Sequence, residues 1–397
     1  MNNIVSIFLI IFLSVINSLS FGQLKEDIVQ ESTSYFSLDS AGIFKGDGAM
    51  FIKSKIAQSQ FFLIGEQHDI HEIETFIYSL IPHFKKNGYN NYVTEIGPIA
   101  ADKLTELKQK KASLKSYYQK YLSQTGLSPF GFFSTYEEER TLKQLNAYNV
   151  KLWGIDFENY ASYLFLIDEI YERANKKKVP EQLYNTVYSL AVSTYKQGKN
   201  GFNPDLMDSL LQSPDVRKFL TLSENKRNTS IIEQFRHSLE LNRQLTLGFW
   251  QYRADNMKNN FSELYHTIMD RENFPKTFIK FGAIHTARGT SFNGNLEVGN
   301  MIYELANFNK SKSFSLIIFP RYIFNEQTKE IDDLADDEEM ELLKFSFSDR
   351  WTVINLKRLK ELSIQNNIQL SNATLDYILK YDAIVIPPAA KYSTKIL

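Results

Sequence analysis

The chain has 397 residues, of which 43% are hydrophobic and 14% aromatic, so it can bury a large core without metals or disulfides. Its formal net charge of −1 excludes the positive surface that nucleic-acid binding requires. The sequence contains no cysteine, which excludes disulfides, a thiol nucleophile, thiolate metal ligands and a lipid-modified cysteine. Any chemistry therefore depends on His, Asp, Glu, Ser, Tyr and Arg side chains.

Residues 1–22 are expected to be a signal peptide. Their apolar run, residues 4–16, has the length of a signal-peptide core and falls short of the ~20 residues that a membrane-spanning helix needs. Ser20 and Gly22 provide the small residues of a cleavage site, although no Lys or Arg precedes the run. The alternative is an amino terminus that anchors the protein in a membrane. We expect cleavage, leaving residues 23–397 as a periplasmic or secreted protein without a stable membrane span.

Short apolar segments that each end in polar residues are predicted to be β-strands. Amphipathic helical periodicity fills the gaps between them, and a succession of strand, helix and strand implies a parallel sheet. The predicted strands are residues 61–64, 92–93, 151–153 and 278–281, with 314–319 and 383–386 as later additions. The predicted helices are residues 70–86, 100–121, 136–148, 356–365 and 375–380. The predicted fold class is therefore α/β, with a largely parallel β-sheet core flanked by helices.

The segment at about 160–271 is predicted to be a long helical insertion between two strands. Residues 230–270 contain little Gly or Pro that would break one or two long helices. Long additions to α/β folds leave from the functional end of the sheet, as loops do. We therefore expect one domain whose insertion caps the carboxyl ends of the strands.

Polar residues follow four of the predicted strands at the point where each strand ends. Glu66 and His68 follow the first strand, and Glu95 follows the second. Asp156 follows the third strand and His285 the fourth. Ligands of parallel sheets bind beyond the carboxyl ends of the strands, so we expect these side chains to meet in one site. Such a set suits hydrolysis, which needs a base that titrates near neutral pH, an orienting carboxylate and donors where negative charge develops.

Several nearby polar residues have structural interpretations. Asp69 followed three residues later by Glu72 is typical of a capping box that opens the next helix. His71, in the first turn of that helix, either reaches the site or lies on the surface. Asp156 either belongs to the site or caps the segment that follows it, and Glu158 is a weaker candidate.

The chain combines two Gly-x-x-His turns, an acid after the second strand and an Arg-x-x-x-Met helix. The same combination occurs in a known superfamily. In this chain they are Gly65-Glu66-Gln67-His68, Gly282-Ala283-Ile284-His285, Glu95, and Arg253 with Met257. The combination resembles the superfamily that joins the erythromycin esterase-like hydrolases, the Tiki and TraB proteases and a bacterial haem-binding uptake family. The resemblance spans about residues 61–386 and implies that Arg253 reaches the same pocket as the turns. Gly282 would also let the backbone approach a ligand.

Two positions depart from the esterases. The first turn of the esterases carries an extra residue between Glu and His, so Glu66-Gln67-His68-Asp69 is more similar to the haem-binding branch. The arginine of the esterases is usually followed by an acid, where this chain has Ala254. The subfamily therefore stays open, and a fold transfers between relatives better than a function does.

The leading hypothesis is hydrolysis of an ester or related acyl bond in a small-molecule or peptide substrate. His68 is expected to act as general base on water, oriented by Glu66 or Glu95. His285 and Arg253 are expected to stabilise the oxyanion. Attack would be direct, because the chain lacks both cysteine and a Gly-x-Ser-x-Gly elbow. The predicted catalytic set is Glu66, His68, Glu95, Arg253 and His285.

Two alternatives remain open at this point, and no cofactor is assured. The resemblance to the Tiki proteases permits a divalent metal on His68, His285 and Glu95 or Glu66, a ligand set that suits zinc, manganese or cobalt. The resemblance to the haem-binding branch permits a non-enzymatic haem protein in which a histidine or one of the 22 tyrosines ligates iron. Such haem would be non-covalent, because no Cys-x-x-Cys-His motif is present. The oligomeric state is not predicted.

Overall fold

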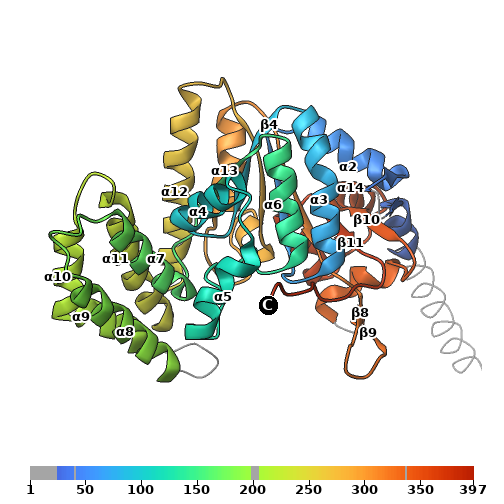
Figure 1. The fold of residues 1–397 in the computed structure, drawn as a ribbon. Helices are drawn as coiled ribbons and strands as arrows, with labels where there is room; N and C mark the ends of the chain where they lie inside the picture. The colour runs from blue at the N-terminus through green and yellow to red at the C-terminus, as the bar shows by residue number, and fades with distance from the viewer. Residues whose placement is uncertain (1–24, 40–41, 198–204, 336–337) are drawn as a thin grey trace, which may run out of the picture.

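A nine-stranded sheet forms the centre of the structure, a computed structural model that describes residues 25–39, 42–197, 205–335 and 338–397 (Figure 1). The predicted signal peptide lies outside the described residues. In space the strands follow the order β2-β1-β10-β11-β7-β3-β6-β4-β5. Their bounds are β1 Thr33–Leu38, β2 Phe44–Lys45, β3 Phe61–Glu66, β4 Tyr89–Thr94, β5 Lys151–Gly154, β6 Lys276–Gly282, β7 Ser313–Ile318, β10 Trp351–Asn355 and β11 Ala383–Ile386. A separate antiparallel pair joins β8 (Tyr322–Phe324) and β9 (Ile331–Asp333).

The strands that carry the site belong to the parallel part of the sheet. Strands β11, β7, β3, β6, β4 and β5 pair in parallel. Strands β10, β1 and β2 continue the sheet in antiparallel fashion at one edge. The predicted α/β class with a largely parallel sheet is therefore confirmed. The sequence pattern does not predict β1 and β2, because β1 is rich in Ser and Thr and β2 has two residues.

Different helices cover the two faces of the sheet, and the alternation of side chains along β3 shows this. Phe62 and Ile64 pack on one face with α3. Phe61 and Leu63 pack on the other face with α12 and α13. The helices outside the insertion are α2 Asp47–Gln58, α3 His71–Lys86, α4 Pro98–Gln109, α5 Leu114–Thr125, α6 Tyr136–Ala147, α13 Val298–Phe308, α14 Leu356–Gln365 and α15 Asn372–Lys380.

One predicted helix is in fact two. The apolar periodicity of residues 100–121 runs on through a break that separates α4 from α5. Lys111 has a left-handed φ of 52°, which the α-helix does not allow. Ser113 then accepts the N–H of Ser116 and caps the amino terminus of α5. The prediction of a single helix is wrong because it ignored this capping signal.

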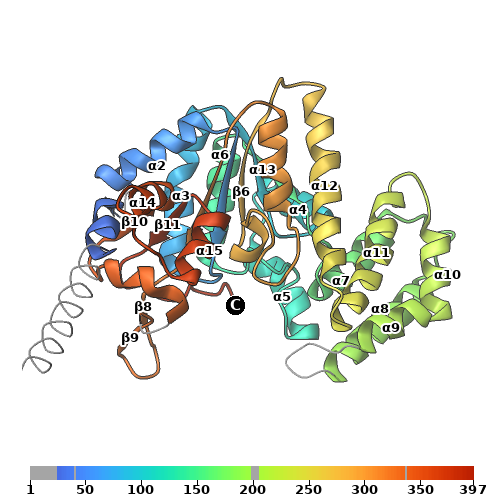
Figure 2. The same cartoon turned by 180° about the vertical axis from the view of Figure 1, so that it is seen from behind.

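The chain between β5 and β6 is helical in its described part, apart from short connections. Its elements are η1 Tyr160–Ser162, α7 Tyr163–Arg173, α8 Glu181–Gln197, α9 Asp205–Gln212, α10 Pro214–Ser223, α11 Thr229–Thr246 and α12 Gln251–Met269. Figures 1 and 2 show α7 to α11 as a lobe beside the sheet, with α12 returning along its flank. None of the described helices combines the length and apolar character that crossing a membrane requires.

The loop after β3 is held by a segment from the other end of the described chain. Asp69 and Glu72 do not form the predicted capping box, because the N-cap of α3 is Ile70 and has no side-chain hydrogen bond. Asp69 Oδ1 instead accepts from Lys395 Nζ at 2.7 Å. Glu72 Oε2 accepts the N–H of Lys391 at 2.8 Å. The two acids therefore stabilise the loop through distant residues, which local sequence does not reveal.

Candidate active site

The two Gly-x-x-His turns lie side by side at the carboxyl ends of β3 and β6. These strands are parallel neighbours, with Glu66 opposite Gly282. Each glycine makes room for the other turn. A Cβ on Gly65 would lie 2.2 Å from Thr286 Oγ1, and a Cβ on Gly282 would lie 2.9 Å from His68 Nε2. Gly282 therefore admits the ring of His68, whereas the sequence pattern suggested room for a ligand.

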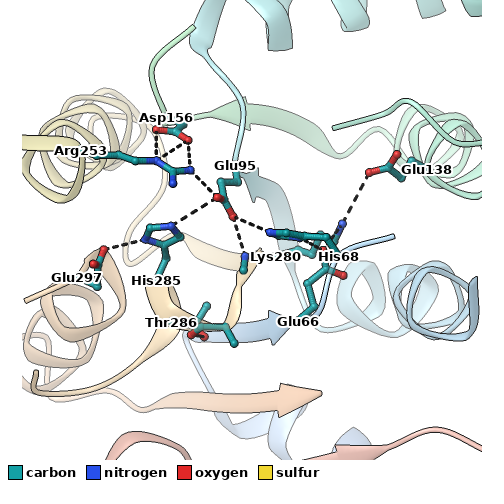
Figure 3. Close-up of polar contacts among 12 residues, drawn as sticks. Glu66, His68, Glu95, Glu138, Asp156, Arg253, Lys280, His285, Thr286 and Glu297 are labelled. Carbon is teal, nitrogen blue, oxygen red and sulfur yellow. Dashed lines mark hydrogen bonds and ion pairs between the residues drawn. The ribbon is translucent and has the colours of Figure 1, made fainter. Parts of the chain in front are cut away.

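Glu95, which follows β4, lies at the centre of the cluster (Figure 3). Its Oε1 is 2.5 Å from Arg253 Nη2 and 3.5 Å from His285 Nε2. Its Oε2 accepts the N–H of Gly282 at 2.7 Å and lies 3.9 Å from His68 Nε2. Burial opposes the charge of Glu95, but His285 and Arg253 outweigh burial and hold its pKa well below the usual range. Glu95 is therefore a fixed anion that both histidines face.

Arg253, in the first turn of α12, is held from its other side by Asp156. Its Nε and Nη2 donate to the Asp156 carboxylate at 3.2 and 2.7 Å. Burial disfavours the guanidinium charge, but Asp156 and Glu95 raise its pKa above the ordinary value. The guanidinium also lies 5.6 Å from the centre of the Phe157 ring. Asp156 thus positions Arg253 against Glu95, which answers the question that the sequence left open for this residue.

His68 is the more accessible of the two histidines, with 39% of its side chain exposed. Its Nδ1 lies 2.9 Å from Glu66 Oε1. A neutral His68 therefore donates its Nδ1 proton to Glu66 and leaves Nε2 able to accept another. Burial lowers the pKa of His68, but the hydrogen bond to Glu66 and the charges of Glu66 and Glu95 outweigh it, so the pKa is raised. The ring also packs against Phe132, with centroids 4.7 Å apart.

His285 is enclosed between two acids, and 10% of its side chain is exposed. Its Nδ1 lies 2.8 Å from Glu297 Oε2, while Nε2 faces Glu95. Burial lowers its pKa, but the charge of Glu95 and the hydrogen bond to Glu297 raise it to about 9. His285 is therefore an imidazolium cation at neutral pH.

A buried charge network supports His68 through Glu66. Lys280, on β6, places its Nζ 2.7 Å from Glu66 Oε1 and 2.6 Å from Glu74 Oε1. Glu138 Oε1 lies 4.0 Å from the same nitrogen. Burial disfavours the Lys280 cation, but Glu66 and Glu74 hold its pKa well above the usual value. Lys280 thereby ties the partner of His68 to α3 and α6, which carry the other two acids.

A cavity of about 440 Å³ lies beside the cluster, between the sheet and the insertion. Glu95, Asp156 and Arg253 form its charged wall. The other walls are mostly aromatic or uncharged and polar. They include Phe132, Phe157, Tyr160 and Trp250 together with Asn159, Ser162, Asn242 and Thr246. His68 itself is not among the residues that line the cavity, but Glu95 and Phe132 border both the cavity and the ring of His68.

The structure brings together all five side chains of the predicted catalytic set, which are Glu66, His68, Glu95, Arg253 and His285. His71 instead pairs with Glu137 at 2.7 Å, and Glu158 accepts the N–H of Ile99 at the start of α4. The residues that the sequence analysis missed are Glu74, Glu138, Lys280 and Glu297. Of these, Lys280 carries a signal, because a single cation within an apolar strand of a parallel sheet needs buried partners.

The cluster does not fit a divalent metal. Among the residues that the structure describes, no three His, Asp or Glu side chains are placed to hold a metal ion. Glu66 is paired with Lys280 and Glu95 with Arg253. The metal-dependent alternative therefore has no support in the geometry of this site.

Three solved structures share the fold. A Bacillus cereus protein aligns over 94% of this chain and 99% of its own, with a TM-score of 0.55 and 14% identity. Erythromycin esterase EreC, solved as a His-to-Asn mutant in its open conformation, aligns over 89% of this chain and 97% of its own, with a TM-score of 0.55 and 14% identity. A succinoglycan biosynthesis protein aligns over 94% of this chain and 99% of its own, with a TM-score of 0.54 and 14% identity.

Other comparisons give less. ChaN of Campylobacter jejuni, a haem-binding protein, aligns over 72% of this chain with a TM-score of 0.31, too low to support an argument about haem. The sequence matches no protein-family profile and no curated protein. The fold that the resemblance to the erythromycin esterases implies is thus confirmed. At 14% identity, this protein has the fold of an erythromycin esterase.

Proposed function

We propose that this protein hydrolyses an ester or related acyl bond with water that His68 activates. One observation carries the proposal. The accessible imidazole of His68, hydrogen-bonded to Glu66, lies on one side of the Glu95 carboxylate, and Arg253 and His285 lie on the other, beside a cavity. A base, fixed cations and a place for a substrate are the parts that acyl hydrolysis requires. The shared fold with erythromycin esterase EreC supports the same class of chemistry.

His68 acts as the general base through its Nε2. This nitrogen takes a proton from water while the water oxygen forms a bond to the carbonyl carbon. Glu66 holds the Nδ1 proton and stabilises the imidazolium that results, as an orienting carboxylate does. The two distances favour Glu66 over Glu95 for this role, because Glu66 lies 2.9 Å and Glu95 3.9 Å from the nearest ring nitrogen. When the intermediate collapses, the bond from carbon to the leaving oxygen breaks and His68 returns the proton to that oxygen.

Arg253 and His285 stabilise the negative charge that develops on the carbonyl oxygen. The Nε and Nη2 atoms of Arg253 bind acids, which leaves Nη1 without a hydrogen bond to any described residue. The contact of His285 Nε2 with Glu95 is long, at 3.5 Å, so a substrate oxygen can compete for this donor. Both groups carry their charge before the substrate binds, which is the condition for stabilising a transition state without reorganisation.

Direct attack by water fits the residues around the cavity. Ser162 lines the cavity, but its hydroxyl donates to the carbonyl of Pro129 at 2.7 Å. No histidine contacts Ser162 among the described residues, so no base activates it as a nucleophile. Water therefore remains the nucleophile of the proposal.

The test is a His68→Ala variant assayed by pH-stat on a panel of uncharged esters and lactones. We expect kcat to fall by about 10²- to 10⁴-fold, the usual contribution of a general base. His71→Ala is the matched control, because His71 pairs with Glu137 and not with a residue of the catalytic set, and should keep wild-type rates. A chelator should leave the wild-type rate unchanged. Equal rates in the wild type and His68→Ala would refute the proposed role.

A further inference from the structure

Four exposed apolar residues lie within six positions of one another at the turn between α11 and α12. Leu247, Phe249, Trp250 and Tyr252 are 61%, 54%, 49% and 52% exposed. Scattered exposed apolar residues are normal on protein surfaces, but a contiguous group beside a cavity marks a binding surface. We call these four residues the apolar rim.

The apolar rim is continuous with the cavity. Trp250 belongs to both, since it lines the cavity and is half exposed. Leu245 and Thr246, which directly precede the rim in the chain, also line the cavity. Trp250 and Arg253 are three positions apart at the start of α12 and share one side of the helix. A bound molecule that extends from Arg253 to the rim therefore contacts Trp250.

The turn that carries the rim is held by its own backbone. The N–H groups of Leu247 and Phe249 both donate to the carbonyl of Gln244, at 3.1 and 3.2 Å. Gly248 takes the left-handed φ of 87° that this tight turn requires. The rings of Phe249 and Tyr252 pack edge to face with centroids 6.2 Å apart. The rim is therefore a preformed apolar surface, and a ligand need not order it on binding.

The charges of the cavity restrict the reacting end of the ligand. Arg253 is the cation of the cavity wall, and its charge is shared between Glu95 and Asp156. Both carboxylates already pair with this guanidinium, and His285 faces Glu95 from the other side, so among the described residues this wall has no unpaired cation for an anionic ligand. An uncharged ester needs no such cation and can accept hydrogen bonds from Arg253.

We propose that the substrate is an uncharged amphiphilic acyl ester whose reacting bond lies beside Glu95 and Arg253 and whose apolar group covers the apolar rim. The inference rests on the proposed hydrolysis for its chemistry. A cavity of about 440 Å³ is near the small end of ligand sites, so a longer molecule extends onto the rim. Burial of this apolar group supplies the affinity that the small cavity lacks.

The kinetic test compares two esters of different apolar size, methyl acetate and methyl octanoate, in a Leu247→Ser/Phe249→Ser double variant. We expect the ratio of the octanoate KM to the acetate KM to rise about tenfold, with kcat for octanoate maintained. Phe308→Ser is the matched control, because Phe308 is 84% exposed at the end of α13 and should leave the ratio at its wild-type value. The single variant Phe249→Ser should give a smaller rise and serves if the double variant unfolds. An unchanged ratio in both rim variants overturns the inference.

A second readout needs no turnover. Trp153 and Trp351 are 5% and 4% exposed, so ligand binding on the surface changes the solvent exposure of Trp250 alone among the tryptophans. A shift in the wavelength of tryptophan emission therefore reports Trp250. Methyl octanoate below its solubility limit should shift the emission to shorter wavelength, and methyl acetate should not. If the emission shifts but the protein hydrolyses no ester, the rim binds apolar ligands and the proposed hydrolysis is wrong. Acetate hydrolysis without the shift overturns the rim alone. The rim could instead bind a membrane surface. In that case the wild type binds phosphatidylcholine vesicles, the double variant does not, and the KM ratio is unchanged; this result also overturns the inference.

Discussion

The two histidine turns begin with the same motif and end in different environments. The first leaves His68 with 39% of its side chain exposed, bound through Nδ1 to Glu66. The second encloses His285, with 10% exposed, between Glu95 and Glu297. Both pKa values are raised, but that of His285 reaches about 9. One motif therefore yields an accessible histidine in one place and an enclosed histidine that is charged at neutral pH in the other.

The difference comes from the residues around each ring and not from the turns themselves. His68 shares its acid with Lys280, whose positive charge offsets part of the negative charge of Glu66. His285 has Glu297 for one nitrogen and Glu95 near the other. Both rings face Glu95, but Glu66 beside His68 is paired with Lys280, whereas Glu297 beside His285 has no lysine partner among the described residues, which favours the charged form of His285 more strongly. The role of a histidine in such a pair is thus set by what its neighbours already bind.

The largest expected effect comes from removing Lys280, which pairs with Glu66 in the turn that carries His68. Lys280→Met leaves Glu66, Glu74 and Glu138 without their buried cation, and we expect the free energy of unfolding to fall by about 3–5 kcal/mol at pH 8. The loss should shrink toward pH 5, where the unpaired acids take up protons. Urea denaturation at both pH values measures this. Lys110→Met, whose side chain is 69% exposed, is the control and should change stability by less than about 0.5 kcal/mol. An equal loss at both pH values would mean that packing, and not charge, is what Lys280 provides.

The next effect tests the fixed cation of the second turn. His285→Gln keeps a polar side chain but removes the charge, and we expect kcat to fall by about 10²- to 10³-fold with KM little changed. His237→Gln is the control, because His237 binds Asn256 at 2.8 Å and lies outside the catalytic set. Steady-state kinetics on a hydrolysed ester gives both constants. A normal kcat in His285→Gln would mean that Arg253 alone stabilises the oxyanion.

The smallest effect is on the pH dependence of kcat, and it separates the two histidines directly. The base must be neutral, so the rate should rise with pH through the pKa of His68, which lies above its ordinary value. The cation must be protonated, so the rate should fall as pH passes about 9, the pKa of His285. Glu297→Gln removes one acid from His285 and should move only the falling limb, to lower pH. A shift of the rising limb in this variant would mean that His285 is the base and His68 the cation.

The parallel core and four of the five site residues follow from the sequence because each signal is local, whereas Arg253 follows from the resemblance to a known family. Buried parallel strands are short apolar runs, and Glu66, His68, Glu95 and His285 directly follow three of them. The partners of these residues are not local. Glu74 has the pattern of an ordinary polar helix position, and Glu138 has that of the third residue in the capping box that opens α6, so neither pattern indicates a buried lysine partner. Asp69 and Glu72 fit a capping box, but residues far along the chain bind them instead.

The strand order has a consequence for how the molecule folds. Strand β6 lies between β3 and β4, although the chain forms β3 and β4 consecutively and adds β6 only after the whole helical insertion. The hydrogen bond from Gly282 to Glu95 spans 187 positions. The entropy of closing so long a loop must be overcome before Glu95 meets Gly282, and early pairing of β3 with β4 would have to open again. The helices can therefore form first, and the proposed site is completed by the late entry of β6.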